Sequence, residues 1–109
     1  MRPIVITQTG IGTTAPVPLD RYISPFEVTL RCVVSGNPVY GVQYTYDDVF
    51  SVAPGSIDWL NSTAIPAGST TSLQDNYDNP VSAVRINLTG VGAPTDSVKM
   101  TVNQAGIVG

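Results

Sequence analysis

Hydrophobic and polar residues alternate along the segment Val39–Asp48, which reads VYGVQYTYDD. Successive side chains of a β-strand point to opposite faces, so every second residue of this segment shares a face. One face would carry Tyr40, Val42, Tyr44 and Tyr46. This is the most strongly amphipathic segment of the chain, and it predicts a strand whose inward face is mainly aromatic.

Four other segments show the same alternation and are predicted strands: Pro3–Thr9, Phe26–Val34, Ser82–Thr89 and Ser97–Gln104. The turn-forming run Ser35-Gly36-Asn37-Pro38 predicts a hairpin that pairs Phe26–Val34 with Val39–Asp48. Ser69–Pro80 is polar enough to predict a loop. Gly and Pro interrupt every stretch that could form a helix.

These patterns predict an all-β fold. Six to eight short antiparallel strands, separated by regular turn signals, are typical of a β-sandwich or jelly roll. The chain has 109 residues, which predicts a single domain spanning 1–109. The predicted core includes Val28, Leu30, Val42, Tyr44, Val84, Ile86, Val98 and Met100.

Gly10–Pro18 (GIGTTAPVP) is predicted to be an extended linker, because its prolines cannot donate ladder hydrogen bonds. The role of residues 1–25 leaves two alternatives open. Pro3–Thr9 either folds back as an edge strand of its own sandwich, or it reaches out as an arm and extends a sheet of a neighbouring subunit. In the second case Ile4 and Ile6 would bind the partner, and Pro16 and Pro18 would keep an extended tether between arm and domain.

Charged residues make up only 12 % of the chain, whereas Ser and Thr together number 21. Such a surface suits a protein that packs against other proteins, and it equally suits a neutral secreted-type sandwich. The net charge of −3 and five scattered basic residues argue against a nucleic-acid partner. The chain has no apolar run of about 20 residues that would span a membrane. The apolar run in MRPIVITQTG is too short for a secretory signal, which predicts synthesis in the cytoplasm.

The sequence predicts neither an enzyme nor a cofactor. It has no His, Lys99 is its only lysine, and Cys32 lies on an apolar stripe as a small buried hydrophobe. The pair Asp47-Asp48 is expected to accept backbone hydrogen bonds in a turn. A Ca²⁺ site that also uses aspartates of other loops is the alternative, but the spacing matches no calcium loop, so no metal is predicted. The tyrosine face could likewise be an aromatic platform for a sugar, although core packing is favoured.

Several stretches resemble a known family. Pro3–Thr9 and PLDRYISPF (Pro18–Phe26), then VQYTYDDVF (Val42–Phe50), and the final part from Pro80 to Gly106 are similar to small virion proteins of tailed bacteriophages. The resemblance implies a virion protein that decorates and cements the head by binding the major capsid protein. Because symmetric particles favour repeated, self-associating parts, a homo-oligomer, trimer or dimer, is expected, either free or only when docked. The alternative is a tail, connector or adhesion module that binds a glycan of the host surface.

The segment Tyr40–Asp48, followed by Trp59 and Val84–Asn87, also resembles discoidin-like sandwiches, in which a strand that ends in an acidic turn precedes a tryptophan. This second resemblance implies the sandwich fold. The binding-loop residues of those domains have no counterparts here.

Overall fold

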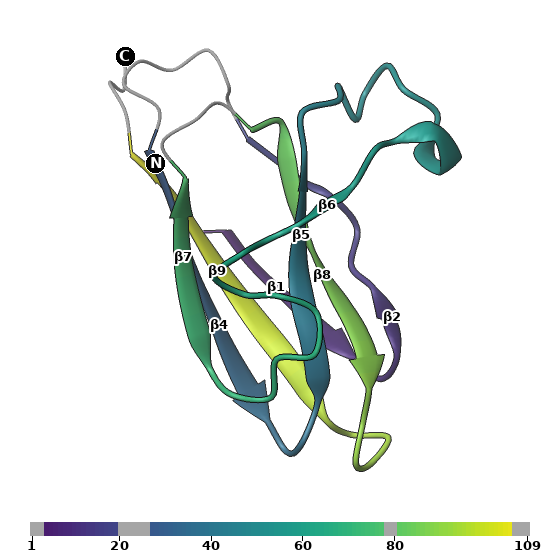
Figure 1. Cartoon of the computed structure of the whole chain (residues 1–109), viewed down its shortest axis with the longest axis vertical. Helices are drawn as coiled ribbons and strands as arrows, with labels where there is room; N and C mark the ends of the chain where they lie inside the picture. The colour runs from purple at the N-terminus through teal and green to yellow at the C-terminus, as the bar shows by residue number, and fades with distance from the viewer. Residues whose placement is uncertain (1–3, 20–26, 78–80, 106–109) are drawn as a thin grey trace.

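The computed structural model describes residues 4–19, 27–77 and 81–105 of the chain. Nearly all regular structure is β, and the strands form two packed sheets (Figure 1). A 3-10 turn, η1, spans Pro54–Ser56. The strands are β1 (Ile4–Thr9), β2 (Gly12–Thr13), β3 (Val17–Pro18), β4 (Glu27–Ser35), β5 (Val39–Thr45), β6 (Leu60–Asn61), β7 (Leu73–Tyr77), β8 (Ala83–Gly90) and β9 (Ser97–Ala105).

The strand order confirms the predicted sandwich. The first sheet runs β1-β9-β4-β7 and the second runs β2-β8-β5-β6, with β3 also paired to β8. All pairings are antiparallel. If β2 and β3 are counted as one interrupted strand, the described residues form eight strands. Successive strands then belong to alternate sheets, except that β5 and β6 lie in the same sheet. This arrangement is a jelly roll.

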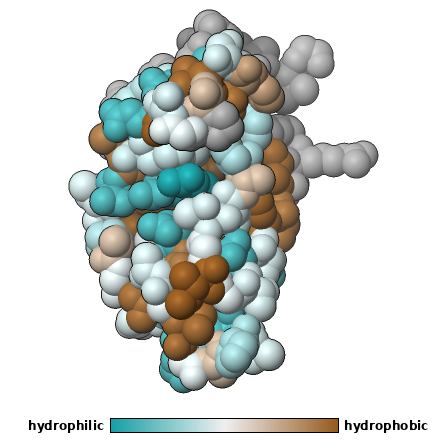
Figure 2. All heavy atoms as spheres, turned by 90° about the vertical axis from the view of Figure 1, so that its right-hand side faces the viewer, coloured by the Kyte–Doolittle hydropathy of each residue, from teal (hydrophilic) through white to brown (hydrophobic). Residues whose placement is uncertain are grey.

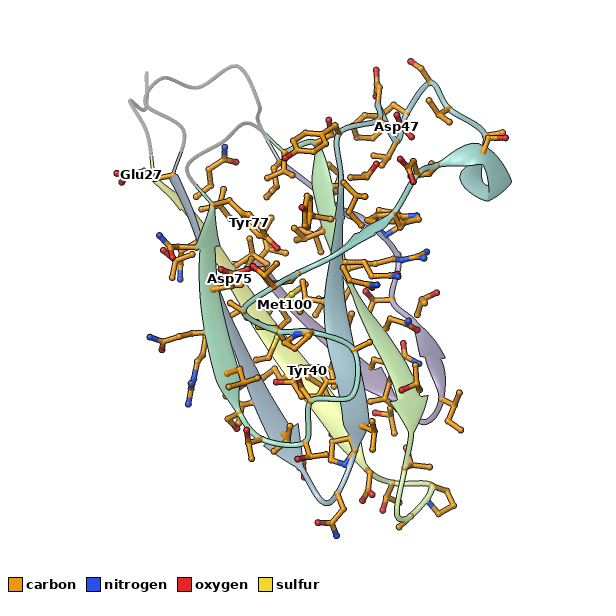
Figure 3. The ribbon with its side chains drawn as sticks, viewed as in Figure 1. Glu27, Tyr40, Asp47, Asp75, Tyr77 and Met100 are labelled. Atoms are coloured by element: carbon orange, nitrogen blue, oxygen red, sulfur yellow. The ribbon has the colours of Figure 1, made fainter. Side chains whose placement is uncertain are left out.

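The core lies between the two sheets and contains every residue predicted for it, with one of them only half-buried. Tyr40 and Met100 are both fully buried there and lie between the sheets in Figure 3. The exception is Tyr44, which packs against the edge of the core. Tyr46 is 52 % exposed, because β5 ends at Thr45 and the tyrosine alternation continues past the end of the strand.

The predicted hairpin between Phe26–Val34 and Val39–Asp48 is wrong. β4 pairs with β9 and β7, whereas β5 pairs with β8 and β6, so the turn at residues 35–38 connects the two sheets as an arch. Both strands have a fully apolar inward face, and an arch buries these two faces against each other. A hairpin would instead place them side by side in one sheet.

Asp96, which lies just before β9, packs against the arch. Its carboxylate Oδ2 accepts hydrogen bonds from the backbone N–H groups of Gly92 and Ala93, at 2.8 and 2.9 Å. Gly36 in the arch has a φ of +82°, and a Cβ there would overlap the Asp96 carboxylate. The arch and the β8–β9 loop therefore pack together only because residue 36 has no side chain.

Asp96 predicts a pH dependence of stability. Hydrogen bonds from backbone N–H groups, that of Ala93 first, hold the pKa of Asp96 below its ordinary value of 3.8. A lowered pKa in the folded state adds stability that is complete well above pH 3.8 and is lost as the pH falls through the lowered pKa. Urea midpoints measured from pH 6 down to pH 2.5 should fall in the acid range. The fall should be smaller in Asp96→Asn, and an identical fall in both proteins would contradict this role.

The segment 10–18 was predicted to be an extended linker, and this prediction is wrong. β2 and β3 both pair with β8 and form an edge of the second sheet. Between them, Thr14 Oγ1 accepts a hydrogen bond from the N–H of Ile86 at 3.0 Å, and the Thr14 N–H donates to the Ile86 carbonyl at 3.0 Å. Glycine and proline are tolerated here because an edge strand needs ladder hydrogen bonds on only one side.

The segment Ser69–Pro80, predicted to be a loop, contains the strand β7. Its inward positions are Leu73, Asp75 and Tyr77, and its outward positions, Gln74 and Asn76, are exposed. Because the middle inward residue is the aspartate Asp75, apolar and polar residues do not alternate along this segment, and the strand was missed. β7 pairs only with β4 and forms an edge of the first sheet.

The connection from β6 to β7 crosses from the second sheet to the first along the β5 and β7 edges (Figure 1). It packs directly on the β5 backbone, where Tyr40 and Ser69 exchange two backbone hydrogen bonds of 2.9 Å. Gly41 allows this approach, because a Cβ there would lie 2.8 Å from the backbone N and Cα of Ala67. This connection supplies one wall of the pocket described below.

Candidate functional site

The loop from Tyr46 to Asp58 projects beyond the end of β5 and carries η1 at its far side (Figure 1). The two aspartates brace it. Asp48 accepts hydrogen bonds from the Phe50 N–H and the Ser51 hydroxyl, both at 3.0 Å. Asp47 Oδ2 accepts from the Asp58 N–H at 2.7 Å and so ties the two ends of the loop together. The expectation that this pair accepts hydrogen bonds in a turn is confirmed.

This braced loop presents aromatic surface to solvent. Phe50 is 82 % exposed, the highest value among the exposed large hydrophobic residues, and Tyr46 is 52 % exposed. A single exposed apolar side chain is common on protein surfaces. Here, however, the Asp48 carboxylate fixes the backbone at Phe50, so the ring is displayed by an ordered turn. Such a loop needs little further ordering when it binds.

The outer face of the second sheet carries a band of hydrophilic residues, which crosses the middle of the view in Figure 2. Arg85 lies with its guanidinium carbon 4.2 Å from the centre of the Trp59 ring, a cation–π contact. Its Nε donates to Gln43 Oε1 at 2.8 Å, and Gln43 Nε2 donates to Asn61 at 3.3 Å. Partial burial lowers the pKa of Arg85. Trp59 thus lies on the outer face of the sheet.

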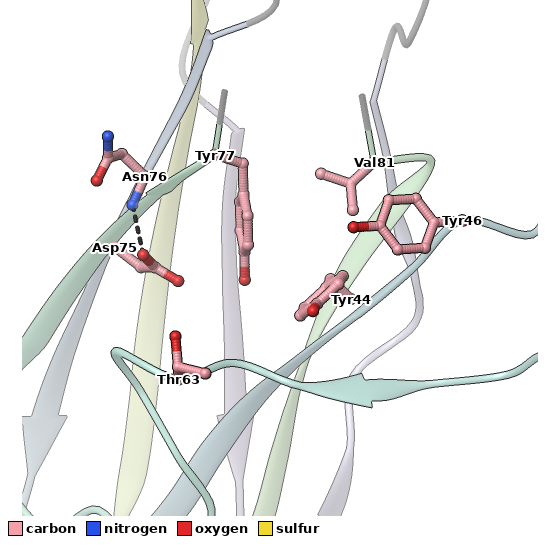
Figure 4. Close-up of a pocket in the computed structure, with 7 residues that line it drawn as sticks. All are labelled: Tyr44, Tyr46, Thr63, Asp75, Asn76, Tyr77 and Val81. Carbon is pink, nitrogen blue, oxygen red and sulfur yellow. Dashed lines mark hydrogen bonds between the residues drawn. The ribbon is translucent and has the colours of Figure 1, made fainter. Parts of the chain in front are cut away.

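A pocket opens at the edge between β5 and β7 and encloses about 220 Å³ (Figure 4). Three tyrosines form its aromatic side. The Tyr44 ring meets Tyr46 edge-on, with centroids 5.7 Å apart, and lies tilted against Tyr77 at 5.3 Å. The opposite side is polar and consists of Thr63, Asp75 and Asn76.

Asp75 organises the polar side of this pocket. Its Oδ2 accepts a hydrogen bond from the Ser62 hydroxyl at 2.7 Å, and its Oδ1 accepts from the N–H of Asn76 at 2.7 Å. Ser62 in turn accepts from the N–H of Ile65 at 3.1 Å, which fixes the β6–β7 connection against β7. An ionised carboxylate can accept about four hydrogen bonds, so Asp75 retains capacity toward the pocket.

The Tyr77 hydroxyl is buried at the bottom of this pocket. It has no hydrogen-bond partner among the described residues, because Ser62 and Asp75 are directed to each other. Burial raises the pKa of Tyr77; the nearby Ser62 hydroxyl lowers this pKa and Asp75 raises it further. The hydroxyl therefore stays protonated at neutral pH and can both donate and accept a hydrogen bond.

The four residues predicted to bind a partner lie on two different edges. Ile4 and Ile6 belong to β1, which pairs with β9 of the same chain, and both side chains pack against the core. The structure thus adopts the alternative in which Pro3–Thr9 folds back, with Pro3 and residues 20–25 of the arm outside the described residues. Pro16 and Pro18 are exposed at the edge of the second sheet. No contact brings the two pairs together into one site, and a role in partner binding stays a prediction.

Cys32 is a buried free thiol, as the apolar stripe predicted. Burial raises its pKa to about 12, so the thiolate needed of a nucleophile does not form at neutral pH. Within 4–19, 27–77 and 81–105, no three Cys, Asp or Glu side chains gather as a metal site. The same part of the chain holds no helix that is long and apolar enough to cross a bilayer.

Comparison with known proteins identifies no family. No family model and no curated protein matches the chain. Two chains of solved structures match. One belongs to a structure described as "Bacillus endospore appendages form a novel family of disulfide-linked pili", with 15 % identity, a TM-score of 0.47, and coverage of 98 % of this chain and 87 % of that chain.

Sequence patterns did not find the pocket. Asp75 and Tyr77 fell in a predicted loop, and Ser62 and Thr63 come from an irregular connection with no motif. The sequence did offer one signal, the tyrosine alternation of Val39–Asp48. This alternation places Tyr44 and Tyr46 at the end of β5, where both rings line the pocket. Phe50 carried a further signal, because it closely follows two turn-forming aspartates.

Proposed function

We propose that this chain is a structural protein of a bacteriophage particle, which decorates the head by binding the major capsid protein. The observation that carries the proposal is the exposed Phe50 on a loop braced by Asp47 and Asp48. The resemblance of Val42–Phe50 to small virion proteins covers this same loop.

Docking through Phe50 has a simple energetic basis. Full burial of a phenylalanine side chain is worth roughly 1.5–3 kcal/mol. Most of that gain would count toward binding, because the loop is already ordered and little conformational entropy remains to be lost. Aromatic side chains that fill a pocket on the partner commonly dominate the affinity of an interface.

The low charge of the chain supports the same role. Only 12 % of its residues are charged, and the cores of protein interfaces are depleted in charged side chains. Capsids present the same binding surface many times, so copies docked at symmetry-related positions would form a homo-oligomer in the particle. In the proposed function the protein stabilises the head through the surface that it buries against the capsid, and it catalyses no reaction and needs no cofactor.

Localisation tests this proposal directly. Particles of the phage that encodes the chain are purified and separated into heads and tails, and each fraction is analysed by quantitative mass spectrometry. We expect the chain in heads, at a copy number that is a simple fraction of the capsid-protein number. Its presence in tails would favour the adhesion alternative, and its absence from both fractions would contradict any virion role.

Replacement of Phe50 tests the docking loop. Phe50→Ala should weaken binding to heads that lack the protein by about 10- to 30-fold, because the anchor is lost while the braced backbone stays. Co-sedimentation with purified heads measures this affinity. Ile11→Ala is the matched control, since Ile11 is 68 % exposed and lies at the β1–β2 turn, outside the loop. Equal losses in both variants would contradict a specific role for Phe50.

A further inference from the structure

We propose that the pocket between β5 and β7 binds one neutral sugar ring of a glycan, with Asp75 and Tyr77 as its hydrogen-bonding groups. This site is separate from the proposed docking residue Phe50, which does not line the pocket. The inference therefore does not depend on the role of the chain in a particle.

The chemistry of the walls selects the class of ligand. The polar side offers a hydroxyl from Thr63 and the carboxylate of Asp75, while the aromatic and apolar walls are tyrosines and Val81. Among the described residues, no cationic side chain lines the pocket to attract a phosphate or carboxylate ligand, and Asp75 would repel one. Hydroxyl and carboxylate groups beside aromatic rings suit a neutral ligand that has both hydroxyl groups and apolar C–H surface.

The Tyr77 hydroxyl supplies the second, independent observation. It is buried, directed into the space between Asp75, Thr63 and Tyr44, and without a partner among the described residues (Figure 4). A buried hydroxyl that makes no hydrogen bond is costly, and the great majority of such groups are satisfied in native proteins. A ligand hydroxyl that reaches Tyr77 after a small shift of the pocket walls could accept from Tyr77 and donate to Asp75 at the same time.

The aromatic side fits a ring-shaped ligand. Tyr44 and Tyr77 are half-buried and fixed by their mutual contact, while Tyr46 is 52 % exposed at the mouth. The apolar face of a sugar ring could pack on such a surface. The approximate volume of 220 Å³ is below the range of about 300–1,000 Å³ typical of drug-sized ligands, so the pocket accommodates a single ring.

Neighbouring hollows give a longer glycan room to continue. Two further depressions, of about 430 and 320 Å³, lie along β7 and share Asn76 with the pocket. One is lined by Thr29 and Gln74, and the other by Glu27 and Thr29. The end residue of an oligosaccharide would occupy the tyrosine pocket, and the next residues would lie over the outward polar side chains of β4 and β7.

An array of neutral oligosaccharides, followed by saturation-transfer NMR with the best-binding sugar, tests the proposal. Glucose, galactose and N-acetylglucosamine serve as monosaccharide probes, and choline tests the alternative of a cation held by the tyrosines. We expect weak, millimolar binding of at least one neutral sugar. Binding of choline alone, or of no neutral sugar on the array, would overturn the proposal.

Variants assign the binding to this pocket. Tyr77→Phe and Asp75→Asn keep the shape of the walls and should each weaken sugar binding about tenfold or more. Tyr46→Ala removes a ring that is 52 % exposed, so this variant should fold. It therefore still tests the pocket if Tyr77→Phe or Asp75→Asn fails to fold. Phe50→Ala is the control and should bind sugar like the parent, so loss of head binding and loss of sugar binding are separable. Unchanged sugar binding in all three pocket variants would overturn the assignment.

Discussion

Deletion of residues 1–9 is expected to abolish the cooperative unfolding transition of this protein. β1 pairs with β9 along its whole length, from Ile4 opposite Val102 to Thr9 opposite Ser97. Ile4 and Ile6 also pack against the core. Without β1, the central strand β9 would become an edge, and the buried side chains of Met100 and Val102 would be open to water on one side.

Circular dichroism melts of the full-length and truncated proteins measure this effect. A full-length variant with Ile4→Ser and Ile6→Ser serves as the control, because it retains the main-chain ladder and loses only the apolar contacts. We expect an intermediate melting temperature for the control and no cooperative transition for the deletion. If the truncated chain melts like the parent but no longer binds particles or self-associates, Pro3–Thr9 acts between molecules and the intramolecular role is contradicted.

The second large effect is expected at the centre of the core. Ile86 in β8 is completely buried, and its backbone is bonded to β5 on one side and to Thr14 on the other. Ile86→Ala would leave a cavity that the two hydrogen-bonded sheets cannot collapse to fill. The cost should be about 2–5 kcal/mol of unfolding free energy. Urea denaturation, analysed with a common slope, measures this loss.

Ile11→Ala provides the matched control for the core variant, because it removes the same atoms from a side chain that is 68 % exposed. Its effect on unfolding should lie within about 0.5 kcal/mol of zero. A loss below about half a kilocalorie for Ile86→Ala would contradict the strand register, because a shift of one residue turns this side chain to the outer face.

The sequence by itself determined the long strands β1, β4, β5, β8 and β9 and the core residues that they carry. The alternation of Val28, Leu30 and Cys32, and of Val84, Ile86 and Leu88, identified β4, β8 and their inward faces correctly. This information is local, because a strand with one buried face must repeat every two residues whatever it pairs with. The turn role of Asp47 and Asp48 was also local, because each carboxylate accepts its hydrogen bonds from groups of its own loop.

The tertiary structure alone decided how the strands pair. A backbone ladder offers the same N–H and C=O groups to every partner, so nothing in the Phe26–Val34 pattern distinguishes β5 from β7 and β9 as neighbours. The turn residues at 35–38 serve a hairpin and an arch equally well, and the choice depends on Asp96, sixty residues after Gly36. The Gly/Pro-rich segment 10–18 became part of a sheet only because β8 offered it a free edge.

The pocket could not be predicted from the sequence, for a related reason. Its walls come largely from Tyr44 in β5, from β7 and from the β6–β7 connection, and they meet because β5, with the short edge strand β6, lies at the end of the second sheet that faces the β7 edge of the first. Asp75 is polar at an inward position, which a hydrophobicity pattern assigns to a loop. Its burial is tolerated because the Ser62 hydroxyl and the Asn76 N–H reach it, and those hydrogen bonds exist only in the folded chain.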